Sequence, residues 1–190
     1  MKTGRPRGFD REQALTTAMD LFWKKGFEAT SKRDLMEATG VGSQSLYNAF
    51  GDKRSLYIEA LHHYADGALK GLEDSLRASD SPLADVRAVI NSWENGISEG
   101  CLLANTATEF GGNDEELSGF VAKQMARAMD TLAAALQRAQ DAGELPADND
   151  PARLALTLFS IRGGLCTMSR CGIPDATIKA TIAAALALLP

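Results

Sequence analysis

The sequence predicts an all-α chain, and three observations support this prediction. Apolar residues recur at the 3.6-residue spacing of helices, capping residues flank the recurring segments, and no segment has the alternating pattern of a strand. With 190 residues, 45% of them hydrophobic, the chain can bury a core in one large or two small domains. We expect about nine helices, divided between a small three-helix module at residues 1–56 and a larger helical domain at residues 57–190.

The first two helices have capping residues at both ends. Asp10 is a predicted N-cap for a helix that Gly26 ends, because a left-handed residue is favoured there. Ser31 opens the second helix, Asp34 follows three residues later as in a capping box, and Gly40 closes it. The apolar face of the first helix consists of Ala14, Leu15, Ala18, Leu21 and Phe22.

The segment GVGSQSLYNAF, residues 40–50, predicts a third helix from Ser43 to Phe50. With about two turns it is too short to be stable alone, so neighbouring elements must hold it. Its polar residues carry no charge and would contribute little to a core. Something other than burial therefore selects Ser43, Gln44, Ser45 and Asn48.

The rest of the chain continues the helical pattern. Asp52 is a predicted cap for a long connecting helix that runs towards Leu76, and Pro82 suits the first turn of the helix after the polar linker ASDSPL. Further helices are expected in CLLANTATEF, which Gly111 and Gly112 end, in a long segment that Gly143 ends, from about Pro151 to Arg170, and from Pro174 to Leu189.

Charge is distributed unevenly along the chain, whose net charge is −5. Residues 1–57 contain ten Lys and Arg against seven Asp and Glu, whereas residues 58–190 contain ten against eighteen. A basic front can bind phosphate while an acidic body faces away from nucleic acid. Chance variation of charge is the alternative explanation.

No run of 18 apolar residues exists, and the basic start MKTGRPRGFD leads into no apolar segment. We therefore expect neither a membrane span nor a signal peptide, and a soluble protein of the cytoplasm. Cys101, Cys166 and Cys171 form no C-x-x-C pair, so reduced thiols are expected.

A helix that ends at Gly40, a turn of about three residues and a helix that begins at Ser43 form a helix-turn-helix. The second helix of that motif enters the major groove of DNA, where Gln pairs with adenine and Ser or Asn reaches base edges or phosphates. Leu46 and Phe50 would pack back on the first two helices, and the hydroxyl of Tyr47 suits a phosphate.

The segment TSKRDLMEATGVGSQSLYNAFGDKRSLY resembles the DNA-binding module of the TetR family of transcriptional regulators. The residues in register are Thr30, Gly40, Val41, Leu46, Tyr47, Phe50, Lys53 and Leu56. A weaker resemblance covers the body, where GGLCTMSRCG and the last helix are similar to the family's dimerising pair. The resemblance implies a homodimer that represses at palindromic operator DNA and is released when a small molecule enters the ligand-binding and dimerisation domain. Gly42 and Asn48 depart from the family's common residues, which leaves the base contacts open.

The expected DNA contacts are of two kinds, those that position the protein and those that read the sequence. Arg5 and Arg7 lie in an arm that can enter the minor groove, with a solvated tail as the alternative. The start of the second helix and Lys53 favour phosphate, although Lys32 and Arg33 could be simple solvated charges. Gln44 is the main candidate for base reading. The full predicted set is Arg5, Arg7, Thr30, Ser31, Lys32, Arg33, Gly42, Ser43, Gln44, Ser45, Tyr47, Asn48 and Lys53.

Large soft side chains and a few polar ones are candidates for contact with an effector in the body. For the large ones, core packing is the alternative, and for the polar ones, exposure to solvent. This set is Trp93, Cys101, Asn105, Thr108, Glu109, Phe110, Met125, Met129 and Phe159. Cys101 follows Gly100 at the start of a short helix, where the helix dipole favours a thiolate. Some TetR-like regulators with a similar Gly-Cys step sense electrophiles or oxidants, and a small buried hydrophobe is the alternative.

Catalysis and metal binding are not expected. The segment GISEG at residues 96–100 fits G-x-S-x-G, but the pattern needs a histidine downstream of Ser98, and His62 and His63 both lie upstream. Adjacent histidines also face about 100° apart on a helix and do not share a metal. We therefore expect a DNA-binding repressor that is not an enzyme and needs no cofactor. The alternative is an all-helical small-molecule carrier or enzyme that uses the body cavity.

Overall fold

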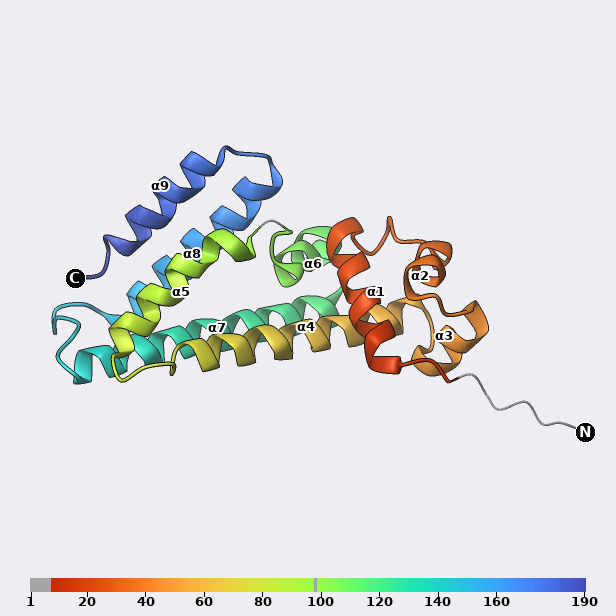
Figure 1. The fold of residues 1–190 in the computed structure, drawn as a ribbon, viewed down its shortest axis with the longest axis horizontal. Coiled ribbons are helices and arrows are strands. Elements are labelled where there is room, and N and C mark those ends of the chain that lie inside the picture. The colour runs from red at the N-terminus through yellow and green to blue at the C-terminus, as the bar shows by residue number, and fades with distance from the viewer. Residues whose placement is uncertain (1–7, 98) are drawn as a thin grey trace, which may run out of the picture. The chain divides into compact units, whose positions relative to one another are not determined.

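The computed structural model describes residues 8–97 and 99–190, so the predicted arm residues Arg5 and Arg7 and the serine of GISEG, Ser98, lie outside the described residues. Within the described part the chain has nine α-helices, one short 3-10 turn and no strand, which confirms the predicted fold class (Figure 1). It divides into two compact units between Tyr64 and Ala65, eight residues beyond the expected limit at residue 56.

The first unit consists of α1 (Arg11–Lys25), α2 (Lys32–Thr39), α3 (Ser43–Phe50) and the first part of α4 (Lys53–Ser75). The predicted caps are confirmed. The Asp10 carboxylate accepts a hydrogen bond from the Gln13 amide at 3.0 Å, and the Asp52 carboxylate accepts one from the Ser55 amide at 2.7 Å. These caps satisfy donors that the first turn of a helix leaves without partners.

Aromatic rings connect α4 to the core of the first unit. The Tyr57 ring meets the Phe22 ring edge to face, with centroids 5.0 Å apart, and both residues are buried. Further along α4, Leu61 is buried and the Tyr64 ring lies 4.9 Å from the Trp23 ring. Because two further turns of α4 pack in this way, the unit extends beyond residue 56. Its other fully buried side chains include Leu35, Leu46 and Leu56.

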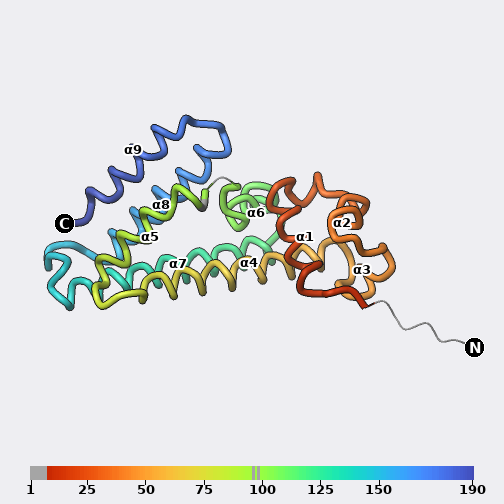
Figure 2. Tube along the Cα trace, viewed as in Figure 1, coloured from red at the N-terminus to blue at the C-terminus, as the bar shows by residue number. Residues whose placement is uncertain are grey.

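The second unit begins in the rest of α4 and continues through the later helices. Its elements are α5 (Pro82–Gly96), α6 (Leu102–Phe110), the 3-10 turn η1 (Gly111–Asn113), α7 (Glu115–Asp141), α8 (Pro151–Arg170) and α9 (Asp175–Leu186). Helix α7 packs along α8 and also contacts α5 and α6, while α9 packs on α5 and α8. Figure 2 shows α8 and α9 side by side, joined by a short turn.

Polar contacts hold the linker between α4 and α5. The Asp85 carboxylate is buried and accepts a hydrogen bond from the Ser79 hydroxyl at 2.8 Å. Glu144 accepts one from the Leu83 amide at 2.8 Å, which satisfies a donor in the first turn of α5. No helix in the described part of the chain is both long and apolar enough to cross a membrane.

Candidate functional site: the helix-turn-helix and the helical body

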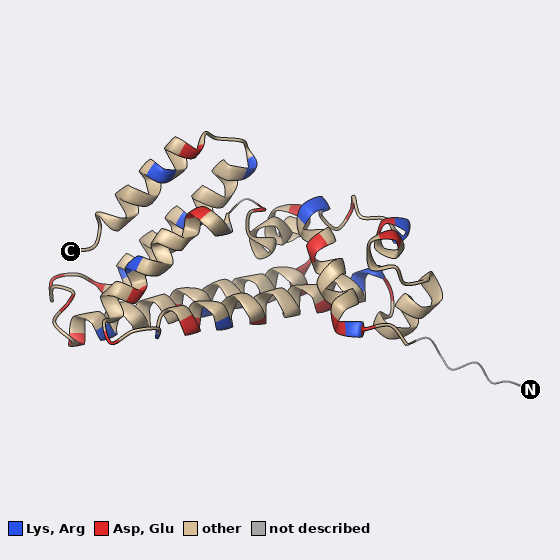
Figure 3. Cartoon of the chain, viewed as in Figure 1, with Lys and Arg blue, Asp and Glu red and all other residues tan. Residues whose placement is uncertain are grey.

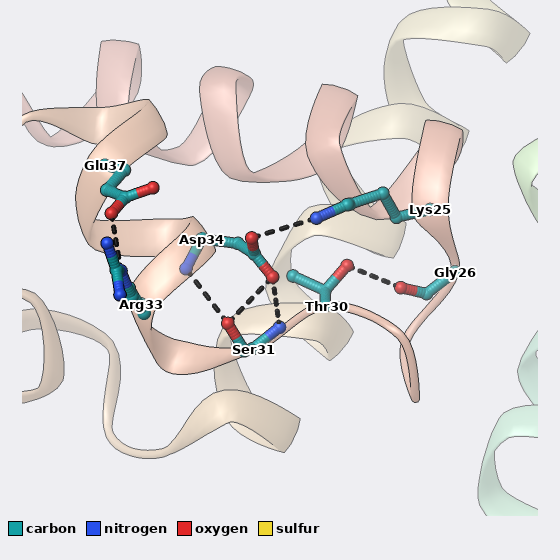
Figure 4. Close-up of polar contacts among 7 residues, drawn as sticks. All are labelled: Lys25, Gly26, Thr30, Ser31, Arg33, Asp34 and Glu37. Atoms are coloured by element: carbon teal, nitrogen blue, oxygen red, sulfur yellow. Dashed lines mark hydrogen bonds and ion pairs between the residues drawn. The ribbon is translucent and has the colours of Figure 1, made fainter.

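The start of α2 is built on a reciprocal cap (Figure 4). The Ser31 hydroxyl accepts a hydrogen bond from the Asp34 amide at 3.1 Å, and the Asp34 carboxylate accepts one from the Ser31 amide at 2.8 Å. Lys25 at the end of α1 forms an ion pair with Asp34 at 2.9 Å. The hydrogen bond from Lys25, followed by those from Ser31, holds the pKa of the Asp34 carboxyl well below its usual range. Asp34 is therefore ionised and fixes the end of α1 against the start of α2.

Thr30 has a structural position in this network. It is fully buried, and its hydroxyl donates to the Gly26 carbonyl at 2.6 Å (Figure 4). The side chain thus orders the turn before α2, whereas the neighbouring Ser31, Lys32 and Arg33 are exposed. Arg33 forms an exposed ion pair with Glu37 at 2.7 Å, one turn further along α2.

The turn into α3 is made by Gly40, whose φ of 68° is left-handed. In α3, Leu46 and Phe50 are buried, as predicted. The opposite face exposes Gln44, Ser45 and Asn48, while Ser43 is half-buried and Gly42 before the helix is exposed. Helix α3 contains no Lys, Arg, Asp or Glu, so its ribbon is tan throughout in Figure 3. An exposed, uncharged face rich in hydrogen-bonding groups suits the edges of DNA bases.

Tyr47 lies at the side of α3. The Lys32 ammonium sits 5.0 Å from the centre of its ring. The hydroxyl oxygen of Tyr47 is buried and has no hydrogen-bond partner in the described structure. Burial, and after it the negative charge of Asp52, raises the pKa of Tyr47, so the hydroxyl remains a donor. An unpaired donor beside a lysine fits a phosphate oxygen, provided that a small shift of the side chain exposes it.

Lys53 begins α4 on the same unit. Its ammonium lies 4.2 Å from the centre of the Phe27 ring, and the residue is half-buried. The ring holds the charge at the start of a helix, where the dipole also favours an anion. The cation–π contact was not foreseen from the sequence, because Phe27 lies in the loop before α2.

The candidate effector residues lie on four helices of the second unit. Trp93 on α5 is in the core, and Phe110, Met125, Met129 and Phe159 are half-buried. On α6, Thr108 and Glu109 are exposed, and the Thr108 hydroxyl donates to the Ala104 carbonyl at 3.0 Å. Asn105 is half-buried, and its amide nitrogen is buried without a hydrogen-bond partner in the described structure.

The three cysteines have different surroundings. Cys101 is the N-cap residue of α6, is half-buried, makes no side-chain capping bond and packs against the core of the body. Cys166 is buried, and this burial raises the pKa of its thiol. Cys171 is exposed. Gly100, before Cys101, has a φ of 77° and is covered by Arg170: a Cβ at this position would lie 2.8 Å from Arg170 Cδ.

A surface groove of about 260 Å³ lies between the end of α4 and α7. It is lined by Glu73, Leu76, Arg77, Asp130, Thr131, Ala134 and Arg138, and none of the predicted effector residues is among them. Arg138 crosses this groove and donates to the Leu76 carbonyl at 2.8 Å.

Comparison with known proteins finds a family model that matches each of the two units. Residues 14–60 match the family model of bacterial regulatory proteins of the tetR family, and residues 82–185 match that of the tetracyclin repressor-like C-terminal domain. The chain is 34% identical over 175 residues to the HTH-type transcriptional repressor ComR of Escherichia coli K12, a match that covers 89% of this chain and 83% of ComR. It is 31% identical over 173 residues to the HTH-type transcriptional regulator YezE of Bacillus subtilis 168, covering 88% of this chain and 89% of that protein.

Solved structures agree with these matches. A cysteine mutant of the TetR family transcriptional regulator CifR, complexed with 26 bp double-strand operator DNA, superposes with a TM-score of 0.85 at 30% identity. The superposition covers 98% of this chain and all of that chain. The matches over both units, the helix-turn-helix geometry and the all-α fold together show that the chain belongs to the TetR family of DNA-binding transcriptional regulators.

Proposed function

We propose that the chain is a repressor that binds palindromic operator DNA as a homodimer and leaves it when an effector acts on the body. The observation that carries the proposal is the exposed, uncharged polar face of α3, beside the basic start of α2. Such a face has no role in packing and matches the donors and acceptors of the major groove. ComR, a similar protein, is a repressor by name, and CifR was solved with operator DNA.

The homodimer is supported by the outer face of α8 and α9. Leu156 on α8 is a large apolar side chain that is 55% exposed, and Leu188, two residues after the end of α9, is 43% exposed. Gly163 and Gly164 are exposed in α8, with nothing within 4 Å of an added Cβ, and glycine weakens a helix interior. Close approach of a second helix pair explains both features. A homodimer contains two copies of α3, one for each half-site of a palindromic operator.

Release from DNA is proposed to begin in the body, in one of two ways. Modification of Cys101 is supported by its place at the N-terminus of α6 and by its partial exposure. A reversibly bound ligand that contacts the half-buried residues of α6, α7 and α8 is the other route, and Asn105 offers it an unused donor. Because its target is DNA, the protein is expected to work in the cytoplasm and to catalyse no reaction of its own.

A mobility-shift experiment with the DNA that flanks the gene tests the proposal. The expected result is a discrete complex that survives an excess of random DNA. If the protein shows no preference for any DNA sequence, and its second unit binds or converts a small molecule, the alternative function of carrier or enzyme would be favoured.

A further inference from the structure

The recognition helix α3 has a backbone cap at its C-terminal end, where the Gly51 amide donates to the Tyr47 carbonyl at 2.9 Å, but it has no side-chain cap at its N-terminal end. It has eight residues, and its N-cap residue, Gly42, provides no side-chain hydrogen bond. Its first turn has no acidic residue and its last turn no basic one. The last carbonyls of a helix have no partners within it and carry its negative dipole end. A helix this short therefore depends on groups from other elements.

Arg11, at the start of α1, supplies these groups at the C-terminal end of α3. Its Nη2 atom donates to the Ala49 carbonyl at 3.4 Å. Its guanidinium carbon lies 4.3 Å from the centre of the Phe50 ring. The Phe9 ring contributes to the same place, 6.4 Å from that of Phe50. One side chain thus gives α3 a hydrogen bond, a positive charge near its negative end and a cation–π contact.

Glu59 on α4 fixes the direction of Arg11. The two guanidinium nitrogens Nη1 and Nη2 lie 2.6 Å and 2.7 Å from the two carboxylate oxygens, so the pair is bidentate. The hydrogen bond to Glu59 is the main cause that raises the pKa of Arg11. A planar fork can hold a carboxylate, a carbonyl and a ring at once, whereas a lysine ammonium cannot. Arg11 therefore joins α1, the end of α3 and α4.

We propose that Arg11 is a positioning residue for DNA reading, which fixes the recognition helix from outside, and that Glu59 orients it. This role rests on operator binding through α3, as proposed above. Only molecules in which α3 is correctly placed can read bases, so loss of the clamp lowers the apparent affinity for the operator. Attraction between basic residues and phosphate does not need that placement, so binding to random DNA is unaffected.

The experiment compares the affinities for operator and random DNA at several salt concentrations by fluorescence anisotropy, below the melting temperature of every variant. Arg11→Ala should weaken operator binding by about five- to tenfold, as expected for loss of a charged helix-end contact, with an unchanged salt slope. Arg11→Lys should recover only part of the loss. The exchanged pair, Arg11→Glu with Glu59→Arg, should not recover it, because a carboxylate would then face the negative end of α3.

Two further variants complete the set. Lys70→Ala is the matched control: it also removes one positive charge and an exposed ion pair, with Asp74 at 2.9 Å, but far along α4 from the recognition helix. Its operator affinity should stay within about twofold of the native value, as for exposed ion pairs in general. Glu59→Gln tests the clamp if Arg11→Ala fails to fold, and it should weaken operator binding in the same direction.

Three results would overturn the inference. Equal weakening on operator and random DNA, with a salt slope shallower by about one, would make Arg11 a phosphate contact. If Arg11→Ala and Glu59→Gln both bind the operator with native affinity, Arg11 has no role in DNA reading. If the exchanged pair recovers the full operator affinity, the role of Arg11 is limited to its ion pair with Glu59. An absence of operator preference in the native protein would instead contradict the proposed function and would be seen before any variant is made.

Discussion

Gln44 and Lys53 represent two ways in which a side chain of this unit can meet DNA. Gln44 is exposed on the uncharged face of α3, where its amide can donate and accept at the same time. Lys53 places a positive charge at the start of α4, held over the Phe27 ring. The first suits a base edge and the second suits a phosphate.

Alanine substitutions should separate these roles. Gln44→Ala is expected to cost about 1–3 kcal/mol on the operator and to relax the preference at one position in each half-site. Lys53→Ala should weaken operator and random DNA alike and make the salt dependence shallower by roughly one unit of slope. Binding titrations on operator variants distinguish the two, and an equal loss of sequence preference in both mutants would show that this division is wrong.

The Asp34 network predicts how the stability of the first unit depends on pH. Its pKa in the folded protein is lowered, so its contribution to stability is complete above the unfolded pKa of about 3.9 and is lost as the pH falls through the lower, folded value. Denaturant unfolding should therefore show a loss of stability below about pH 4. Asp34→Asn should reduce that pH dependence and lower the stability at neutral pH, since it removes the ion pair with Lys25 and weakens the capping box with Ser31. Asp74→Asn, which removes an exposed ion pair, is the control, and the same pH dependence in both variants would contradict the assignment.

Cys101 is the residue on which effector response can be tested most simply. Treatment with a quinone or hypochlorite should weaken operator binding by the native protein and by Cys171→Ser, but not by Cys101→Ser. Cys171 is the suitable control because it is more exposed than Cys101 and does not begin a helix. If all three proteins respond alike, or none responds, a reversibly bound ligand becomes the preferred effector.

At the scale of helices, the sequence predicted what local chemistry determines. Asp10, Ser31 with Asp34, Gly40 and Asp52 act within a few residues of their own position, and each has the predicted place in the structure. Contacts between segments that are distant in the sequence have no comparable local pattern of residues from which they could be predicted. Arg11 and Glu59 are 48 residues apart, and nothing in either segment alone indicates their pairing.

The ends of the later helices show the same limit. The last helix, predicted from Pro174 to Leu189, is formed by Asp175–Leu186, because a continuous apolar pattern does not mark where a helix stops. Around the body, the exposure of Thr108 and Glu109 depends on how α6 rotates against its neighbours. That rotation follows from packing against α7, which periodicity in α6 alone does not determine.

The face of α8 and α9 gives a prediction about assembly. Leu156→Glu should convert a dimer into a monomer at micromolar concentration, because it places a charge at an exposed apolar position of the proposed contact. Light scattering gives the mass directly. Ala122→Glu, at an exposed position of α7, should leave the dimer intact. A monomeric native protein, or a dimeric Leu156→Glu variant, would contradict the proposed interface.

For the whole molecule, the distribution of charge fits a division of labour. The first 57 residues are net basic and the rest are net acidic, so the body is repelled by DNA while the front can approach it. Non-specific attraction alone would give a protein that binds any DNA. The uncharged face of α3 is the feature that should add preference for a sequence.

The central claim, that this chain reads a palindromic operator through α3, is tested most directly by competition binding at physiological salt. Labelled flanking DNA that contains the operator is challenged with the same DNA, with a single half-site and with a scrambled sequence. We predict that the scrambled DNA competes about a thousandfold less well or worse, as for other specific DNA-binding proteins, and that the half-site lies between the two. Equal competition by operator and scrambled DNA would contradict the account.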